Sequence, residues 1–266
     1  MTECNPNVVP CSIQPLGTDA KGQAHFEEWD YASAVGMLMY LAGNAYPEIQ
    51  YAVHQCARFT HAPKHSHAKA VKHIARYLKG VLDKKQGLHY VVTKDLHLDL
   101  YCDADYAGLW KYEDDQDPVC VKSITGYVVT LGRCPIHWTS KLQQELALST
   151  LEAEYIALAM GMREFVHLCR FYEEMTQFFD IFDHSSSTVL SKVFEDNQGC
   201  IQTATAPKMS LRTKHIAVKY HFVRHFFNRD TKCKHEHPFV LEKVASAEQK
   251  ADLFTKGLPA QTFLAL

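Results

Sequence analysis

The spacing of hydrophobic residues changes near residue 88, and this change limits the folds open to the chain. Before it, apolar residues recur every three to four positions over 31–42, 47–59 and 67–79, which is typical of amphipathic helices. The last of these segments is expected to end at Gly80. The pattern predicts a small helical unit over residues 28–87. It is preceded by a tail or linker over 1–27, which is rich in Pro, Asn, Gly and Thr and lacks periodicity.

After residue 88, short segments rich in β-branched and aromatic residues indicate strands. A long apolar helical face over 150–178 and two shorter helical segments interrupt them. The predicted strands cover 89–92, 96–102, 125–131, 136–139, 188–195 and 239–244, and the later helices cover 215–228 and 247–256. Strands followed by alternating helices and strands predict an α/β domain over residues 88–266, built on a mixed sheet flanked by helices.

The formal net charge is only −2, but the charges are segregated along the chain. Eight Lys and Arg residues stand against one acid in 58–85, and eight against one in 208–234. Such blocks are typical of surfaces that bind a polyanion, although ordinary solvated helix faces fit the charge pattern equally well. The candidate nucleic-acid-binding residues are Lys69, Lys72, Arg76, Lys79, Arg212, Lys214 and His215.

Asp103 follows the alternating stretch "LDLYC" and is the first candidate for a metal ligand. An aspartate at this position can also accept backbone hydrogen bonds in a turn. A calcium loop over 103–114 is a second alternative, but Ala107 replaces an oxygen ligand in it and Asp114 replaces the bidentate glutamate.

Three further carboxylates lie at the ends of predicted elements, each with a structural alternative. Glu152 fits a capping box with Ser149, and helical phase does not choose between Glu152 and Glu154 as the functional residue. Asp196 could cap a helix, and Asp252 could be an exposed helical aspartate.

A mixed sheet can bring such strand ends and helix starts to one rim. Four carboxylates there would repel one another unless cations neutralised them, and hard oxygen ligands favour Mg²⁺ or Mn²⁺. Two such ions can hydrolyse a phosphodiester, and the basic blocks could hold its charged backbone.

The cysteines predict the redox environment rather than a zinc site. Nine cysteines occur without a CxxC pair, and no signal peptide or membrane-length apolar run is visible. "CKHEH" lacks a second ligand pair at zinc-finger spacing. We expect an intracellular protein with reduced thiols and no membrane partner.

Six ordered blocks of sequence resemble a copia-type LTR retrotransposon Pol polyprotein. Segments 31–59 and 67–80 resemble the helical thumb or connection region that follows the polymerase palm. The blocks that resemble the ribonuclease H domain are "YCDADYAG", "SITGYVVTLGRCPIHWTSKLQ", "ALSTLEAEYIAL", "EDNQGCIQ", "RTKHIAVKYHFVR" and "KADLFTKGLP".

The resemblance implies a ribonuclease H-like fold that cleaves the RNA strand of RNA–DNA hybrids with two Mg²⁺ or Mn²⁺ ions. It places the catalytic and metal-binding acids on Asp103, Glu152, Asp196 and Asp252, and it is the ground for choosing Glu152 over Glu154. It also suggests work in a cytoplasmic particle or in the nucleus.

The chain departs from this family in three respects, one of which is Leu151 where the family usually has Thr. It contains no Tyr-x-Asp-Asp palm motif, so no polymerase activity is expected, and "EKVASAEQKAD" supplies no histidine before the last aspartate. Two alternatives to the nuclease hypothesis remain open. One is an inert nucleic-acid-binding remnant, and the other is a structural subunit of a reverse transcriptase whose palm is supplied in trans.

Overall fold

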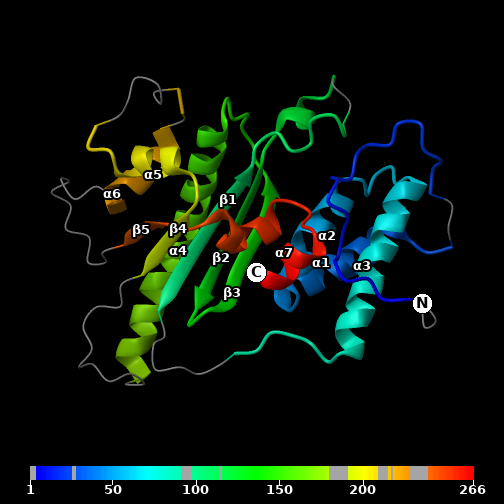
Figure 1. Cartoon of the computed structure of the whole chain (residues 1–266), viewed down its shortest axis with the longest axis horizontal. Helices are drawn as coiled ribbons and strands as arrows, with labels where there is room; N and C mark the ends of the chain where they lie inside the picture. The colour runs from blue at the N-terminus through cyan, green and yellow to red at the C-terminus, as the bar shows by residue number, and fades with distance from the viewer. Residues whose placement is uncertain are drawn as a thin grey trace.

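A five-stranded mixed sheet organises the second half of the chain (Figure 1). The computed structural model describes residues 4–25, 28–90, 97–113, 116–179, 191–208, 215–216, 218–227 and 239–266. The strand order is β3-β2-β1-β4-β5. The bounds are β1 Leu98–Asp105, β2 Ile124–Leu131, β3 Cys134–Leu142, β4 Lys192–Glu195 and β5 Val240–Lys243. Strands β1 to β3 are antiparallel, whereas β4 and β5 run parallel to β1, which confirms the predicted mixed sheet.

The two faces of the central strand β1 pack against different parts of the chain. Because side chains alternate along a strand, Leu98, Leu100 and Cys102 point to one face and pack in the main core. Asp103 belongs to the other set, and it accepts a hydrogen bond from the Thr255 hydroxyl. The strand continues through Asp105, so Asp103 lies inside a strand rather than in a turn or at the start of a calcium loop.

Helix α4 (Thr150–Phe179) covers the first face together with α5 (Gln198–Thr205). The predicted apolar face of α4 is fully buried at Tyr155, Leu158, Met162 and Phe165. Gly161 permits the close approach of helix and strand, because a Cβ there would lie 2.7 Å from Cys102 Sγ. This close contact between α4 and β1 helps to place the first turn of α4 beside the end of β1.

The second face is covered by a 3-10 segment instead of the α-helix predicted over 247–256. It consists of η5 (Ser246–Glu248) and η6 (Lys250–Phe254). Gln249, which lies between them, is fully buried and donates from Nε2 to the Cys102 carbonyl at 2.8 Å. This bond ties η6 to the back of β1, and a side-chain bond of this kind cannot be read from periodicity.

Gly126 of β2 sets the distance between the sheet and η6. A Cβ at this position would lie 2.6 Å from Thr255 Cγ2, 2.8 Å from Phe254 Cβ and 2.9 Å from the Ala251 oxygen. We therefore expect Gly126→Ala to lower the free energy of unfolding by about 1–3 kcal/mol, the usual effect of overpacking, as measured by urea denaturation.

Gly43→Ala is the matched control, because a Cβ there would meet nothing within 4 Å. Because Gly43 is the penultimate residue of α1, this change should leave the free energy of unfolding near that of the parent or raise it by less than about 1 kcal/mol. A Gly126→Ala protein as stable as the parent would show that η6 does not pack as described.

A helical unit packs beside the sheet, near β3 and the C-terminal helix (Figure 1). Its elements are α1 (Tyr31–Asn44), η1 (Pro47–Ile49), α2 (Gln50–Ala57) and α3 (His65–Asp83), which share one apolar core. Trp138 of β3 donates from Nε1 to the Ala42 carbonyl at 2.7 Å, and Phe263 of α7 (Ala260–Ala265) meets Tyr77 edge-on. The other elements among the described residues are η2 (Pro118–Val121), η4 (Val218–Val223) and α6 (Arg224–Phe227).

Residues 4–25 lie along α3 and make specific bonds with it. Asn7 donates from Nδ2 to the His73 carbonyl at 3.1 Å, and a ring nitrogen of His67 lies 2.9 Å from the Gly17 oxygen. The proposed division of the chain into 1–27, 28–87 and 88–266 stays a prediction. No helix among the described residues combines the length and the apolar character needed to cross a bilayer.

Candidate metal centre

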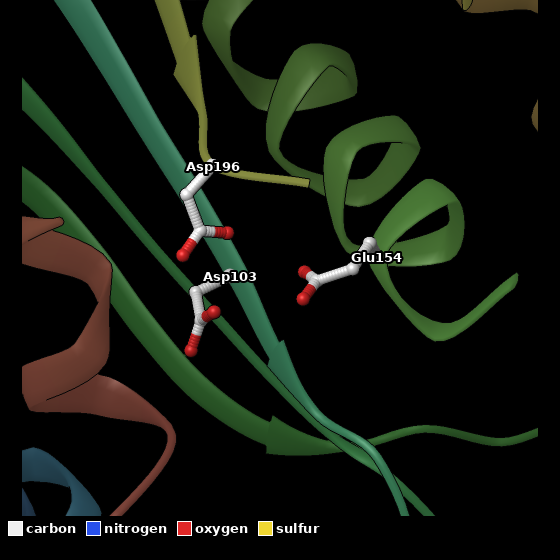
Figure 2. A group of neighbouring side chains, drawn as sticks. All are labelled: Asp103, Glu154 and Asp196. Carbon is white, nitrogen blue, oxygen red and sulfur yellow. The ribbon is translucent and has the colours of Figure 1, made fainter. Parts of the chain in front are cut away.

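Three carboxylates from distant parts of the chain meet at one edge of the sheet (Figure 2). They belong to Asp103 on β1, Glu154 in the first turns of α4, and Asp196, which directly follows β4. One carboxylate oxygen from each lies within 4.8 Å of the others. Asp103 and Glu154 are buried, at 3% and 5% exposed, and Asp196 is half-buried.

The sheet topology explains this meeting. Strands β1 and β4 are parallel neighbours, so their carboxyl ends reach the same edge of the sheet. Helix α4 begins at this edge, and its buried apolar face sets its rotation. Glu154 therefore points between the two strand ends, as Figure 2 shows.

The surroundings of Glu154 suit a ligand of a cation. Its Oε2 atom is buried and has no hydrogen-bond partner among the described residues. Burial raises the pKa of Glu154 far above its usual range, and the negative charges of Glu195, Asp103 and Asp196 raise it further. A backbone hydrogen bond with Ala104 opposes these effects only in part. The donor set is made of hard carboxylate oxygens, so it fits a divalent metal ion.

A fourth carboxyl group, that of Glu195, is close enough to the three acids to affect their charges. It was not identified from the sequence. It is the last residue of β4 and is 0% exposed. Its Oε1 accepts from the Asn197 amide at 3.1 Å, while Oε2 has no partner among the described residues. Burial raises the pKa of Glu195 well above its usual range. The adjacent "ED" pair at 195–196 is the only sequence signal, and it does not show which of the two acids turns inward.

Asp252 borders the group from the opposite face of the sheet. Its pKa is raised to about 7, first by burial and then by the negative charge of Asp103, while Lys256 opposes the rise. The Lys256 ammonium lies 2.9 Å from Asp252 Oδ1 and 3.8 Å from Asp103 Oδ2. Asp252 is therefore next to Asp103, but it lies outside the set of three oxygens within 4.8 Å.

Glu152 occupies a different position from the one expected. Its Oε2 accepts from the Leu148 amide at 2.8 Å, and its own amide donates to Ser149 Oγ at 3.2 Å. The Ser149 half of the capping box that the sequence offered as the alternative is present, while the Glu152 carboxylate caps the Leu148 amide instead of that of Ser149. The structure does not bring Glu152 to Asp103 and Asp196, and we correct the assignment to Glu154. The two residues are two positions apart on a helix, so their side chains leave on different faces.

The predicted nucleic-acid-binding residues have varied surroundings. Lys69 and Lys72 on α3 are exposed. Arg76 and Lys79 instead donate to the carbonyls of Asn5 and Cys4 at 2.7 and 2.9 Å, so they hold the N-terminal segment. A ring nitrogen of His215 lies 3.2 Å from Glu152 Oε2, near the start of α4. Arg212, Lys214, the "CKHEH" cluster and Asp114 lie outside the described residues.

The raised pKa of Asp252 predicts how stability changes with pH in the absence of metal. A carboxyl whose pKa is higher in the folded protein contributes stability below its unfolded pKa, near about 4, and this contribution is lost as the pH rises through about 7. In chelator, we therefore expect Asp252→Asn to become more stable relative to the parent as the pH rises from 5 to 8, as judged by the difference between their free energies of unfolding. Urea denaturation at both pH values measures it. A difference that does not change with pH would contradict the described environment of Asp252.

Comparison with known proteins places the chain beside transposon polyproteins. No protein-family model matches the chain. It is 32% identical over 263 residues to the retrovirus-related Pol polyprotein from transposon RE1 of Arabidopsis thaliana, which covers 99% of the chain and 16% of that protein. It is 34% identical over 254 residues to the Pol polyprotein from transposon TNT 1-94 of Nicotiana tabacum, which covers 96% of the chain and 17% of that protein. The chain thus spans about one sixth of the length of these relatives.

Solved structures similar to the chain include ribonuclease H domains. The N-terminal ribonuclease H domain of a Mycobacterium tuberculosis protein has a TM-score of 0.37 at 13% identity, and covers 60% of this chain and 91% of that one. Ribonuclease H1 of Halobacterium salinarum has a TM-score of 0.35 at 13% identity, and covers 60% of this chain and 94% of that one.

Proposed function

Because the chain belongs to the copia-type family of retrovirus-related Pol polyproteins, we propose that it is a metal-dependent endonuclease that hydrolyses the RNA strand of RNA–DNA hybrids. The observation that carries the proposal is the meeting of Asp103, Glu154 and Asp196 within 4.8 Å. Acids this close and this buried repel one another, and a divalent cation relieves the repulsion.

The chain offers two adjacent places for Mg²⁺ or Mn²⁺. Asp103, Glu154 and Asp196 would hold one ion, and Asp103 with Asp252 would hold the other. When bound, such ions activate water and stabilise the departing oxygen in phosphodiester hydrolysis. Asp103 belongs to both places, and the Thr255 hydroxyl fixes the orientation of its carboxylate by donating to it.

The proposed substrate rests on the resemblance and on charge. Lys69 and Lys72 provide exposed positive charge on the helical unit for a nucleic-acid backbone. Preference for RNA would come from contacts with 2′-hydroxyl groups. We further propose that the rest of a reverse transcriptase is a partner, that no polymerase activity is present, and that the protein works inside the cell.

An assay with an end-labelled RNA–DNA hybrid tests the proposal. We expect cleavage of the RNA strand with Mg²⁺ or Mn²⁺, none in chelator, and none of the matched DNA duplex. Salt-sensitive binding of the hybrid without a metal-dependent product would contradict the nuclease and favour an inert binding module. A stable complex with a separate polymerase palm, again without cleavage, would favour a structural subunit.

A further inference from the structure

Lys256 brings a positive charge of the chain itself into the acidic site. Its ammonium lies 2.9 Å from Asp252 Oδ1 and 3.8 Å from Asp103 Oδ2, while those two side chains are only 9% and 4% exposed. Among the described residues, no other ammonium or guanidinium group lies within 4 Å of either carboxylate. The lysine therefore bridges the two acids that are expected to share a metal ion.

The backbone around Lys256 is held firmly. Its amide donates to the Asp252 carbonyl at 3.3 Å, so the acid and the lysine lie on one turn. The neighbouring Thr255 is fully buried and bonded to Asp103. The side chain of Lys256 is 42% exposed, which leaves the ammonium room to swing into solvent. The lysine thus starts beside the two acids, but it is not locked there.

We infer that Lys256 is a built-in counter-ion of the Asp103–Asp252 pair, and that it competes with a divalent cation for the same carboxylate oxygens. The inference deepens the proposed function and rests on it. The two cation places then become unequal. At the first place, Glu154 and Asp196 have no side-chain cation within 4 Å among the described residues, and Lys256 lies nearer to Asp252, at 2.9 Å, than to Asp103, at 3.8 Å, so this place fills first. The place between Asp103 and Asp252 fills only when the ammonium moves away. Lys256 is a positioning residue in this scheme.

Titration of the metal-free full chain with Mn²⁺, followed by calorimetry, tests this inference. For the parent we expect one tight and one weaker binding event. In Lys256→Met the weaker event should tighten by about tenfold or more. An opposite charge at this distance shifts the pKa of a carboxyl group by about one to three units, and each unit is a tenfold change in an equilibrium constant. The tight event should change less. In chelator, the same variant should unfold at a lower temperature, because two buried acids lose their counter-ion.

Two variants serve as controls. Lys256→Arg keeps the charge, so the weaker event should stay weak. Lys250→Met makes the same change in net charge at the other end of η6, where the ammonium lies 5.0 Å from the Tyr101 ring centre. It should leave both binding events near the parent values. A double-mutant cycle between Lys256→Met and Asp252→Asn should show coupling in chelator.

The outcomes separate the inference from the proposed function. If the parent binds Mn²⁺ and cleaves hybrid, but Lys256→Met binds Mn²⁺ as the parent does, the competition is refuted while the nuclease stands. Equal tightening in Lys250→Met and Lys256→Met would refute it as well, because net charge alone would then explain the change. A parent that binds no divalent ion would overturn the proposed function itself.

Discussion

Replacing Glu154 with glutamine is expected to slow hybrid cleavage by at least about a hundredfold, the scale of losing one group that supports the charge of the transition state. The same change should make the metal-free protein more stable. Glu154 is buried beside Glu195, Asp103 and Asp196, and its pKa is raised for that reason. Neutral glutamine removes the repulsion while keeping the size of the side chain. Initial cleavage rates with Mg²⁺ and thermal unfolding in chelator measure the two effects.

Glu152 provides the matched comparison two residues away. Because its carboxylate accepts from the Leu148 amide, Glu152→Gln should keep both the cap and the cleavage activity. Glu152→Ala should lower the free energy of unfolding by about 1 kcal/mol through loss of the cap. If Glu152→Gln abolished cleavage while Glu154→Gln cleaved normally, the assignment of the metal ligand to Glu154 would be wrong.

Asp103→Asn is expected to have the largest effect on metal binding. Asp103 belongs to both proposed cation places, so both Mn²⁺ binding events should weaken, and cleavage should fall by at least about a hundredfold. The fold should persist, since asparagine can still accept from the Thr255 hydroxyl. Calorimetric titration, cleavage rates and circular dichroism measure these three expectations.

Asp99→Asn on the same strand is the control for Asp103→Asn. Asp99 is also buried, at 5% exposed, and its Oδ2 lies 3.1 Å from His97 Nε2, away from the acidic group. Its substitution should leave Mn²⁺ binding close to the parent value. Undiminished cleavage by Asp103→Asn would refute the assignment of the site.

The features that the sequence predicted well depend on repeated patterns. Alternation along β1 located Asp103, and the apolar stripe of α4 gave the helix to within one residue at its C-terminal end, Phe179. Each pattern repeats over many residues, so an error at one position does not change the result. These two elements carry two of the three meeting carboxylates, Asp103 and Glu154.

The details that the sequence missed depend on single contacts. The apolar stripe of α4 is flanked by both Glu152 and Glu154, and only the cap at Leu148 removes Glu152 from the site. The placement of η6 against β1 involves one buried bond from Gln249 to the Cys102 carbonyl. Arg76 looked like a nucleic-acid contact because the partner that holds it, the Asn5 carbonyl, is a backbone group 71 residues away. Bonds to backbone atoms that are distant in the chain leave no trace in residue type or spacing.

A crystal of the protein grown with Mn²⁺, measured for anomalous scattering, tests most directly whether the three meeting carboxylates form a metal centre. The predicted result is a peak bonded to carboxylate oxygens of Asp103, Glu154 and Asp196, with Glu152 still accepting from the Leu148 amide. A peak bonded to Glu152, or a protein that cleaves hybrid with no metal at these three residues, would contradict the account.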